Sequence, residues 1–175
     1  VVSTLDFGHW EGASQSAYLV MERVDGISLT ELDRSETTVD TKVGLVCQAL
    51  SALAHMHARG ILHRDIKPDN LLIETDDDGT LNIRITDFGL AAAFEFGEDL
   101  KDLNDLTNEN VVLGTAAYMS PEQASSSGLT GPSSDLYALG VVLYELLKGE
   151  RPFTGTPLSI ILAKVRLAAP TILAA

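Results

Sequence analysis

The sequence predicts an α+β protein, with short strands near its start and helices over most of the remainder. Short apolar runs at residues 1–7 and 17–24, separated by a polar stretch, indicate a hairpin with a long loop. In residues 42–59 two rows of apolar side chains recur at helical spacing, which predicts a helix with two buried faces, ended by Gly60 at its C′ position. Residues 134–147 are apolar almost all round, so we expect a buried helix there.

Smaller signals divide the remaining chain. Ser28 follows a glycine and indicates a turn, with its hydroxyl a candidate helix cap. The aliphatic runs 71–73 and 81–85 flank an acidic stretch that contains glycine, which predicts a second hairpin. Thr156-Pro157 offers a cap and a first helical position, and Pro170 should end that last helix.

Composition and charge narrow the function classes. The 175 residues carry 25 acidic and 12 basic side chains, a formal net charge of −13, which argues against nucleic acid or an anionic membrane surface as partner. Cys47 is the single cysteine and cannot build a disulfide framework, which favours a reducing, cytoplasmic setting. No apolar run reaches the ~18 residues of a membrane span, although an anchor outside this sequence is compatible with that.

Two motifs carry the chemistry. Residues 63–70 read His-Arg-Asp-Ile-Lys-Pro-Asp-Asn, and residues 87–89 read Asp-Phe-Gly. Phosphoryl transfer needs a carboxylate to accept the proton of the attacking hydroxyl, oxygen ligands for a metal ion, and a cation beside the charge that moves. Asp65 suits the first role and Lys67 the last, while Asn70 and the aspartate of the second motif offer oxygens suited to Mg²⁺.

In this order and near this spacing, the two motifs resemble the catalytic loop and the magnesium-binding loop of protein kinases. Residues 114–122, Gly-Thr-Ala-Ala-Tyr-Met-Ser-Pro-Glu, resemble the loop that positions the substrate, with Ser where Ala is usual before Pro-Glu. Residues 135–140 resemble the start of the buried helix of the family, and residues 18–24 resemble the strand and hinge that hold adenine. Lys67 and Thr115 fit the pattern of serine/threonine kinases. The residues of these segments are most similar to those of bacterial-type kinases.

The resemblance implies a protein-kinase-like fold and the transfer of the γ-phosphoryl group of ATP to a serine or threonine hydroxyl of a protein substrate. It implies that Asp65 is the base and that Lys67 steadies the transferring phosphate. Asn70 and Asp87 would hold Mg²⁺, and Thr115 would support the base and the substrate loop.

The resemblance also assigns nucleotide-binding and structural residues. The backbone of Glu22 and Val24 would read adenine, Met21 would guard the back of the pocket, and Leu72 would form its floor, with Asp87 also facing the nucleotide. Structural roles are implied for His63, Phe88, Gly89, Glu122 and Asp135, the last by holding the backbone of the catalytic loop.

The segment from Leu90 to Leu113 is acidic, and its simplest interpretation is a solvated loop. A sharper hypothesis starts from Arg64, because kinases with an arginine before the base are similar in needing a negative group to pair with it. Thr107 is then the phosphorylation candidate, while Glu109 supplies part of the charge permanently.

Parts of the family pattern are missing from these 175 residues. No Gly-x-Gly-x-x-Gly precedes the hinge, no Val-Ala-x-Lys strand appears, and the arginine that usually pairs with the Glu122 position is absent. The resemblance therefore implies a kinase domain truncated at both ends: residues 1–24 a remnant of the small lobe and hinge, residues 25–175 an incomplete large lobe. We expect the isolated chain to be inactive and its protein of origin to be an active kinase.

Three alternatives remain open at this stage. A small-molecule phosphotransferase typically lacks the lysine two residues after the base and the Pro-Glu loop, both of which occur here. A pseudokinase scaffold is usually marked by a broken base or metal ligand, and both are intact. A catalytically incompetent fragment, acting as a binding module at best, is the third alternative.

Other features have a simpler interpretation than a functional one. Asp6-Phe7-Gly8 has the same three residues as the expected magnesium-binding loop at 87–89. It precedes the expected hinge, however, and is expected to be a strand end and turn. The acidic run 74–82 is similar to a calcium loop that starts at Glu74, yet Ile85 stands at the twelfth position, where a bidentate acid is required. His55 and His57 are two residues apart and face different sides of a helix, so we expect packing roles and no metal pair.

Overall fold

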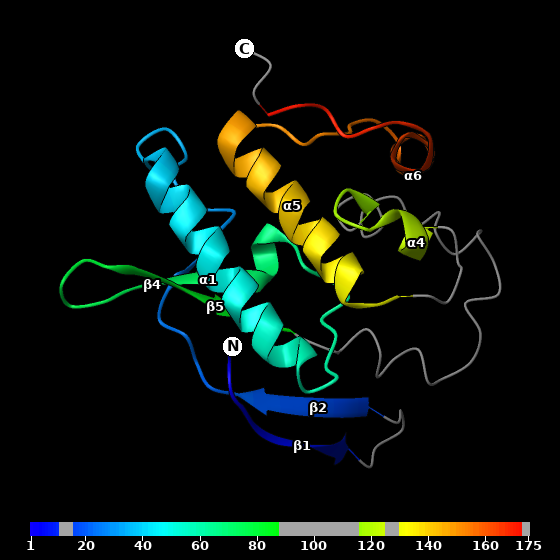
Figure 1. The fold of residues 1–175 in the computed structure, drawn as a ribbon. Coiled ribbons are helices and arrows are strands. Elements are labelled where there is room, and N and C mark those ends of the chain that lie inside the picture. The colour runs from blue at the N-terminus through cyan, green and yellow to red at the C-terminus, as the bar shows by residue number, and fades with distance from the viewer. Residues whose placement is uncertain (11–15, 88–115, 125–129, 173–175) are drawn as a thin grey trace.

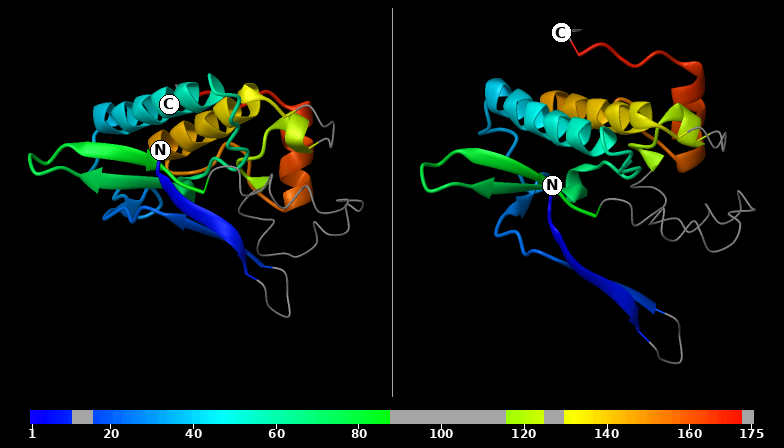
Figure 2. Two further views of the ribbon diagram at one scale, coloured as in Figure 1. Left: turned by 90° about the horizontal axis from the view of Figure 1, so that it is seen from below. Right: turned by 60° about the horizontal axis from the view of Figure 1, so that its bottom comes forward.

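The computed structural model describes residues 1–10, 16–87, 116–124 and 130–172. Two long helices, α1 and α5, lie side by side and run in opposite directions, with the β4–β5 hairpin against α1 (Figure 1). Helices α4 and α6 lie together beyond the start of α5, whereas the β1–β2 ribbon extends away from the helices (Figure 2). The family expectation of a small antiparallel sheet followed by a mainly helical part is confirmed.

The first hairpin is the predicted one, with shifted bounds. Strand β1 (Thr4–Trp10) pairs antiparallel with β2 (Ser16–Met21). The early Asp-Phe-Gly tripeptide lies inside β1, opposite residues of β2, and not at a strand end as predicted. In the described part of the chain β1 pairs along one edge only, and Phe7 is 76% exposed, so this copy of the tripeptide lies on an exposed strand.

A second sheet has the order β3-β4-β5, and all its pairs are antiparallel. The hairpin of β4 (Leu71–Thr75) and β5 (Leu81–Ile85) was predicted, but β3 (Ile27–Ser28) was not. Ser28 therefore sits in a strand instead of capping a helix, and its hydroxyl accepts the N–H of Thr30 in the following turn. Gly26 makes β3 possible, because a Cβ there would collide with the carbonyl of Ile73 in β4.

Helix α1 spans Val39–His57 and is capped by Thr38, whose hydroxyl accepts the N–H of Thr41. Its C-cap is Ala58, so Gly60, with φ +73°, lies one residue beyond the predicted C′ position. The prediction of two buried faces was wrong, because α1 packs against α5 and β5 on one side only. On the other side Val43 and Leu50 are exposed.

Gln48 of α1 covers the outer edge of β5. Its amide Nε2 donates to the carbonyl of Leu81 (3.1 Å) and its Oε1 accepts the N–H of Ile83 (2.9 Å). An edge strand exposes such groups, so one glutamine on the helix both satisfies them and fixes the sheet against α1.

Helix α5 spans Pro132–Lys148, two residues longer at its start than predicted, because Pro132 takes the first helical position. Its face toward α1 is buried, but Leu136 is 45% exposed, so burial on all sides was an overestimate. Gly149 follows at φ +78°, a left-handed residue that ends the helix as glycine does readily.

Two shorter helices complete the described chain. Helix α4 spans Pro121–Ala124 and α6 spans Pro157–Arg166, and the two are in contact. Thr156 caps α6 as predicted, accepting the N–H of Ser159. The helix ends at Arg166, before Pro170.

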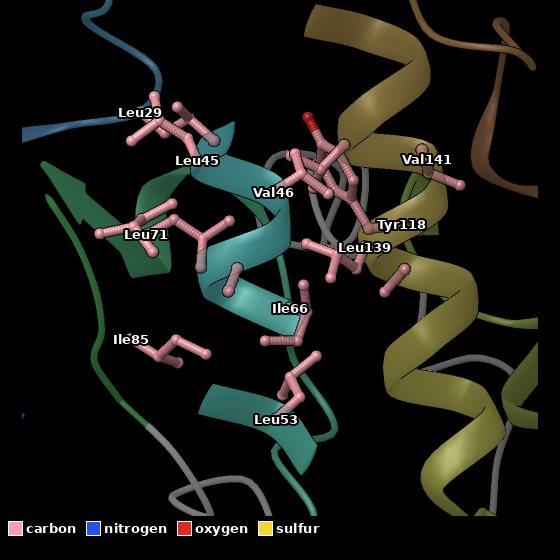
Figure 3. Close-up of a cluster of buried hydrophobic side chains, with 14 of the residues drawn as sticks. Leu29, Leu45, Val46, Leu53, Ile66, Leu71, Ile85, Tyr118, Leu139 and Val141 are labelled. Carbon is pink, nitrogen blue, oxygen red and sulfur yellow. The ribbon is translucent and has the colours of Figure 1, made fainter. Parts of the chain in front are cut away.

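The core lies between α1, α5 and the β4–β5 hairpin (Figure 3). Ile66 of the 63–70 loop and Tyr118 belong to the same cluster, so both segments are attached to the core through an apolar side chain. Its fully buried members are Leu29, Ala49, Leu53, Leu71, Ile85 and Val142. Among the described helices, none is both long and apolar enough to cross a membrane.

Candidate active site

The loop of residues 63–70 folds onto the carboxylate of Asp65. Lys67 Nζ lies 2.7 Å from Asp65 Oδ2, and Asn70 Nδ2 donates to the backbone carbonyl (2.8 Å) and to Oδ2 (3.2 Å) of the same residue. A 3₁₀ turn, Pro68–Asn70, brings Asn70 back toward Asp65, and its proline fixes one backbone angle. The three side chains that the sequence singled out therefore converge within one short loop.

Asp135, in the first turn of α5, anchors this loop from behind. Its carboxylate is 1% exposed and accepts the backbone N–H of His63 (2.9 Å) and of Arg64 (2.8 Å). The same carboxylate lies 2.8 Å from Nε2 of His57, near the end of α1. A buried carboxylate needs such partners, and here they come from two elements distant in sequence.

Arg64 adopts φ +68°, a left-handed conformation that costs a non-glycine residue energy. Its N–H is held by Asp135, and its carbonyl accepts Nε2 of Gln123 (2.9 Å). These two bonds hold the backbone of Arg64 and help to offset the cost of its conformation.

His63 is fully buried, and its ring has a defined tautomer. Nε2 lies 2.9 Å from the carbonyl of Thr86, which can only accept, so Nε2 carries the proton. Nδ1 then accepts the N–H of Asp65 (3.3 Å). Burial lowers the pKa of this imidazole, against the opposing effects of the Thr86 bond and of nearby carboxylates. His63 thus connects the 63–70 loop to the end of β5 as a neutral group.

The end of β5 places Asp87 beside Asn70. The N–H of Thr86 donates to the carbonyl of Asn70 (3.0 Å), and Asp87 follows with φ +58°. Arg64 and Asp87 are the two non-glycine residues with positive φ in the described chain, and both flank the loop. Backbone strain of this kind is concentrated at functional sites in proteins.

The donor set fits Mg²⁺. Because Asn70 uses its Nδ2 within the loop, its Oδ1 is the side-chain atom that remains for a cation, and Asp87 adds a partly exposed carboxylate. Within the described residues no group of three His, Cys, Asp or Glu side chains is placed to hold a metal on its own. Mg²⁺ accepts few protein ligands and completes its shell with phosphate and water, so two oxygen donors suffice.

The hinge residues lie in a stretch tied to β5. The N–H of Glu22 donates to the carbonyl of Ser3 (2.9 Å), so its carbonyl is the backbone group left for a nucleotide. The Glu22 carboxylate accepts the N–H of Ser3 (2.8 Å) and pairs with Arg84 (2.5 Å), and these contacts lower its pKa. Arg84 is directly opposite Leu72 in the β4–β5 ladder, so the two side chains share a face of the sheet. Arg84 therefore connects Leu72, the expected floor of the nucleotide pocket, to Glu22.

Residues 116–119 lie between the loop and the last helix. Tyr118 donates its hydroxyl to Glu145 of α5 (2.6 Å), which also pairs with Arg34 (3.2 Å), and burial together with the Glu145 contact raises the pKa of the Tyr118 hydroxyl. A partly open hollow of about 20 Å³ lies between this segment and the 63–70 loop. Its walls are Arg64, Asp65, Ile66, Tyr118, Met119, Gln123 and Ala138.

Glu122 of α4 is bonded to the start of α5. Its carboxylate accepts the hydroxyl of Ser134 (2.7 Å), and this bond is the main cause of its lowered pKa. The predicted structural role of Glu122 is compatible with this position. Thr107, Glu109, Thr115, Phe88 and Gly89 lie outside the residues that the structure describes.

Three residues of this region escaped the sequence analysis. His57 had been given a packing role, yet it is bonded to Asp135, and nothing local in sequence indicates a partner 78 positions away. Arg84 and Lys164 had no role assigned; Lys164 donates to carbonyls of residues 116–119. For Arg84 a signal did exist, because it alternates with buried Ile83 and Ile85 on the outer face of a strand.

A carboxylate held by a lysine and an asparagine, with the remaining oxygen of that same asparagine and a further aspartate as oxygen donors, is compatible with a phosphotransferase site. The model of the protein kinase domain family matches residues 2–170. The chain belongs to the protein kinase domain family.

Named relatives are serine/threonine kinases of bacteria. The chain is 39% identical over 170 residues to serine/threonine-protein kinase PknB of Mycobacterium tuberculosis, covering 95% of this chain and 26% of that protein. It is 40% identical over 174 residues to serine/threonine-protein kinase PrkC of Bacillus subtilis, covering 98% and 24%. For serine/threonine-protein kinase PknL of Mycobacterium tuberculosis the identity is 41% over 140 residues, covering 79% and 32%. The chain thus spans between about a quarter and a third of the length of these relatives.

Proposed function

We propose that the protein containing this chain is a serine/threonine protein kinase, which transfers the γ-phosphoryl group of ATP to a hydroxyl of a protein substrate. Membership of the kinase family and the names of the relatives support the class of reaction. The observation that carries the proposal is the convergence of Lys67 and Asn70 on the Asp65 carboxylate, with Asp87 beside them through the Thr86–Asn70 bond.

In this proposal Asp65 orients the substrate hydroxyl and accepts its proton as the oxygen attacks phosphorus. Lys67, already 2.7 Å from that carboxylate, is near enough to neutralise charge on the transferring phosphoryl group. Asn70 Oδ1 and the Asp87 carboxylate are the proposed ligands of Mg²⁺, which when bound withdraws charge from the phosphate oxygens.

The nucleotide would lie between the hinge and β4. The carbonyl of Glu22 and the N–H of Val24 are the proposed contacts to adenine, with Met21 behind and Leu72 below. Residues 1–24 would then belong to the small lobe and hinge, and residues 25–175 to the large lobe. The partner is a protein with a serine or threonine acceptor and not nucleic acid, since the chain carries a formal charge of −13. We place the catalytic domain in the cytoplasm.

The two Asp-Phe-Gly copies provide a matched test of the metal site. Asp87→Ala, made in the natural protein that contains these residues, should weaken magnesium-dependent ATP binding. It should lower phosphoryl transfer by at least ~10²-fold, since a metal ion contributes several kcal/mol to such a reaction. Titration calorimetry with ATP and Mg²⁺, and a radiolabelled transfer assay, measure the two effects.

Asp6→Ala is the control, because it removes the same side chain from the same tripeptide in β1, where Asp6 is exposed and accepts the N–H of Phe7 (2.9 Å). Its binding and transfer should stay within about twofold of the wild-type values. Equal catalytic losses in both variants would refute the assignment of Asp87 as the metal ligand.

A further inference from the structure

A buried lysine on α6 is bonded to the backbone of residues 116–119. Lys164 is 6% exposed, and its Nζ lies 2.9 Å from the carbonyl oxygen of Ala116, 2.6 Å from that of Ala117 and 2.7 Å from that of Met119. An ammonium group has three N–H donors and no acceptor, so three carbonyl oxygens use its whole donor capacity.

We propose that Lys164 is a positioning residue for substrate binding: its ammonium group holds residues 116–119 in the shape that receives the protein substrate. The inference rests on the proposed kinase function, because that function makes this segment a wall of the substrate site. Lys164 itself contacts neither the base nor the metal ligands and acts through the segment.

The segment needs such a support because it is buried without belonging to a sheet. Ala116 and Ala117 are each 1% exposed, and their carbonyls would be costly to leave without a donor. Tyr118 attaches the segment to α5 through Glu145, and Lys164 attaches it to α6. The segment is thereby fixed to two helices, one through a side chain and one through its backbone.

Residues 116–119, which Lys164 supports, lie beside Asp65, the proposed base. Met119, whose carbonyl oxygen accepts an N–H of Lys164, lines the hollow of about 20 Å³ that Asp65 also lines. A shift of residues 116–119 would therefore change the space beside the Asp65 carboxylate, where the hydroxyl of a substrate has to reach. Misplacement by about 1 Å is enough to lower an enzymatic rate strongly.

The group that donates to the three carbonyl oxygens is a charged ammonium group in a buried position. Burial, with a contribution from the charge of Arg151, lowers the pKa of Lys164 from 10.5 to about 8, while the three carbonyl oxygens favour the ammonium form. On the elements around it, Tyr137 of α5 presents its ring 5.4 Å from Nζ, α4 carries Glu122, and Arg166 of α6 is exposed. A neutral amine would keep two N–H donors and turn a lone pair toward the third carbonyl.

The first experiment compares Lys164→Met and Lys164→Arg in the natural protein that contains this chain. Methionine fills a similar volume without donors, so the KM for a protein substrate should rise about tenfold or more, because bonds to a charged group are lost. The KM for ATP should stay within about twofold. Arginine keeps the charge and several donors in a different geometry, so it should restore part of the loss.

Ile160→Val provides the matched control on the same helix. Ile160 is 1% exposed and carries no hydrogen bond to residues 116–119, so the variant weakens the packing of α6 and leaves the three carbonyl contacts in place. We expect it to change thermal stability with little change in the KM for substrate. If Ile160→Val and Lys164→Met raise that KM equally, or if arginine rescues nothing, the positioning role is refuted.

A second measurement uses the wild-type protein, so it depends neither on a variant that folds nor on phosphoryl-transfer activity. In the wild-type protein, the carbonyl ¹³C shifts of Ala116 and Ala117 should titrate together with one midpoint between about pH 8 and pH 10.5, the range set by burial and by the ordinary lysine value. Flat shifts over that range would overturn the inference even if the protein is an active kinase. Absence of phosphoryl transfer in the wild-type protein would instead refute the proposed function and leave the titration result valid.

Discussion

At the scale of single residues, the site depends on groups that satisfy one another within a few ångströms. Asp65 is approached by Lys67 and Asn70, and His63 donates to Thr86 while accepting from the N–H of Asp65. The partners of Asp65 and His63 thereby also fix neighbouring parts of the loop, which is how a site is held to a productive geometry.

Asp65→Asn tests the proposed base. Asparagine keeps the size of the side chain but cannot accept a proton, so transfer should fall by ~10²–10⁴-fold, the range typical of a lost general base. ATP binding should be nearly unchanged, because Asp65 is proposed to meet the hydroxyl and not the nucleotide. The two quantities are a single-turnover rate and a calorimetric affinity for ATP with Mg²⁺. A rate within a few-fold of wild type would remove Asp65 from the mechanism.

At this scale the sequence indicated which residues the structure brings together better than it indicated their hydrogen-bond partners. Motif spacing identified Asp65, Asn70 and Asp87, because phosphoryl transfer restricts the residue types and the order in which they occur. It did not indicate the partner of His57, since Asp135 is brought to it by the packing of α5 on α1. Pairs of this kind follow from tertiary structure and have no local signal.

At the scale of elements, Asp135 joins three parts of the chain: α5, the end of α1 and the base loop. Helical periodicity predicted that α1 and α5 exist, but it overestimated how much of each is buried. Apolar spacing shows which residues can face a core and not how many neighbours the helix has, so exposed Val43, Leu50 and Leu136 had been placed inside.

Asp135→Asn should loosen this junction. In the wild type these donors point at a carboxylate, whereas the asparagine amide presents N–H groups of its own toward them. At least one buried hydrogen bond to a charged group is therefore lost, a cost of about 1.5–3 kcal/mol. Urea unfolding should show the loss, and amide hydrogen exchange at His63 and Arg64 should become faster, because these two N–H groups lose their acceptor.

His57→Leu is the companion variant, since it removes the donor from α1 and leaves the two backbone donors of the loop. We expect a smaller loss of stability and unchanged exchange at His63 and Arg64. Faster exchange in His57→Leu, to the same degree as in Asp135→Asn, would show that the loop is held by the contact between the helices and not by the carboxylate.

At the scale of the whole molecule, two effects of acid oppose each other. The chain carries a formal charge of −13 at pH 7, so adding protons relieves self-repulsion and should stabilise the fold. Buried His63 acts in the other direction, because its folded-state pKa lies below 6.5. As the pH falls through 6.5 the unfolded chain binds a proton there before the folded chain does, so folding stability is lost below that pH.

Because salt screens the first effect, we expect the free energy of unfolding in 1 M salt to fall as the pH drops from 7 to about 5.5. Near 1 M salt the Debye length is about 3 Å, so surface repulsion is screened while the buried imidazole is affected little. Urea unfolding of the wild type in 1 M salt should keep its pH slope in this range, and His63→Leu should lose it. The slope is the readout, since the variant also loses the bond to Thr86 and is less stable at every pH. An equal slope in His63→Leu would assign the acid sensitivity to another group.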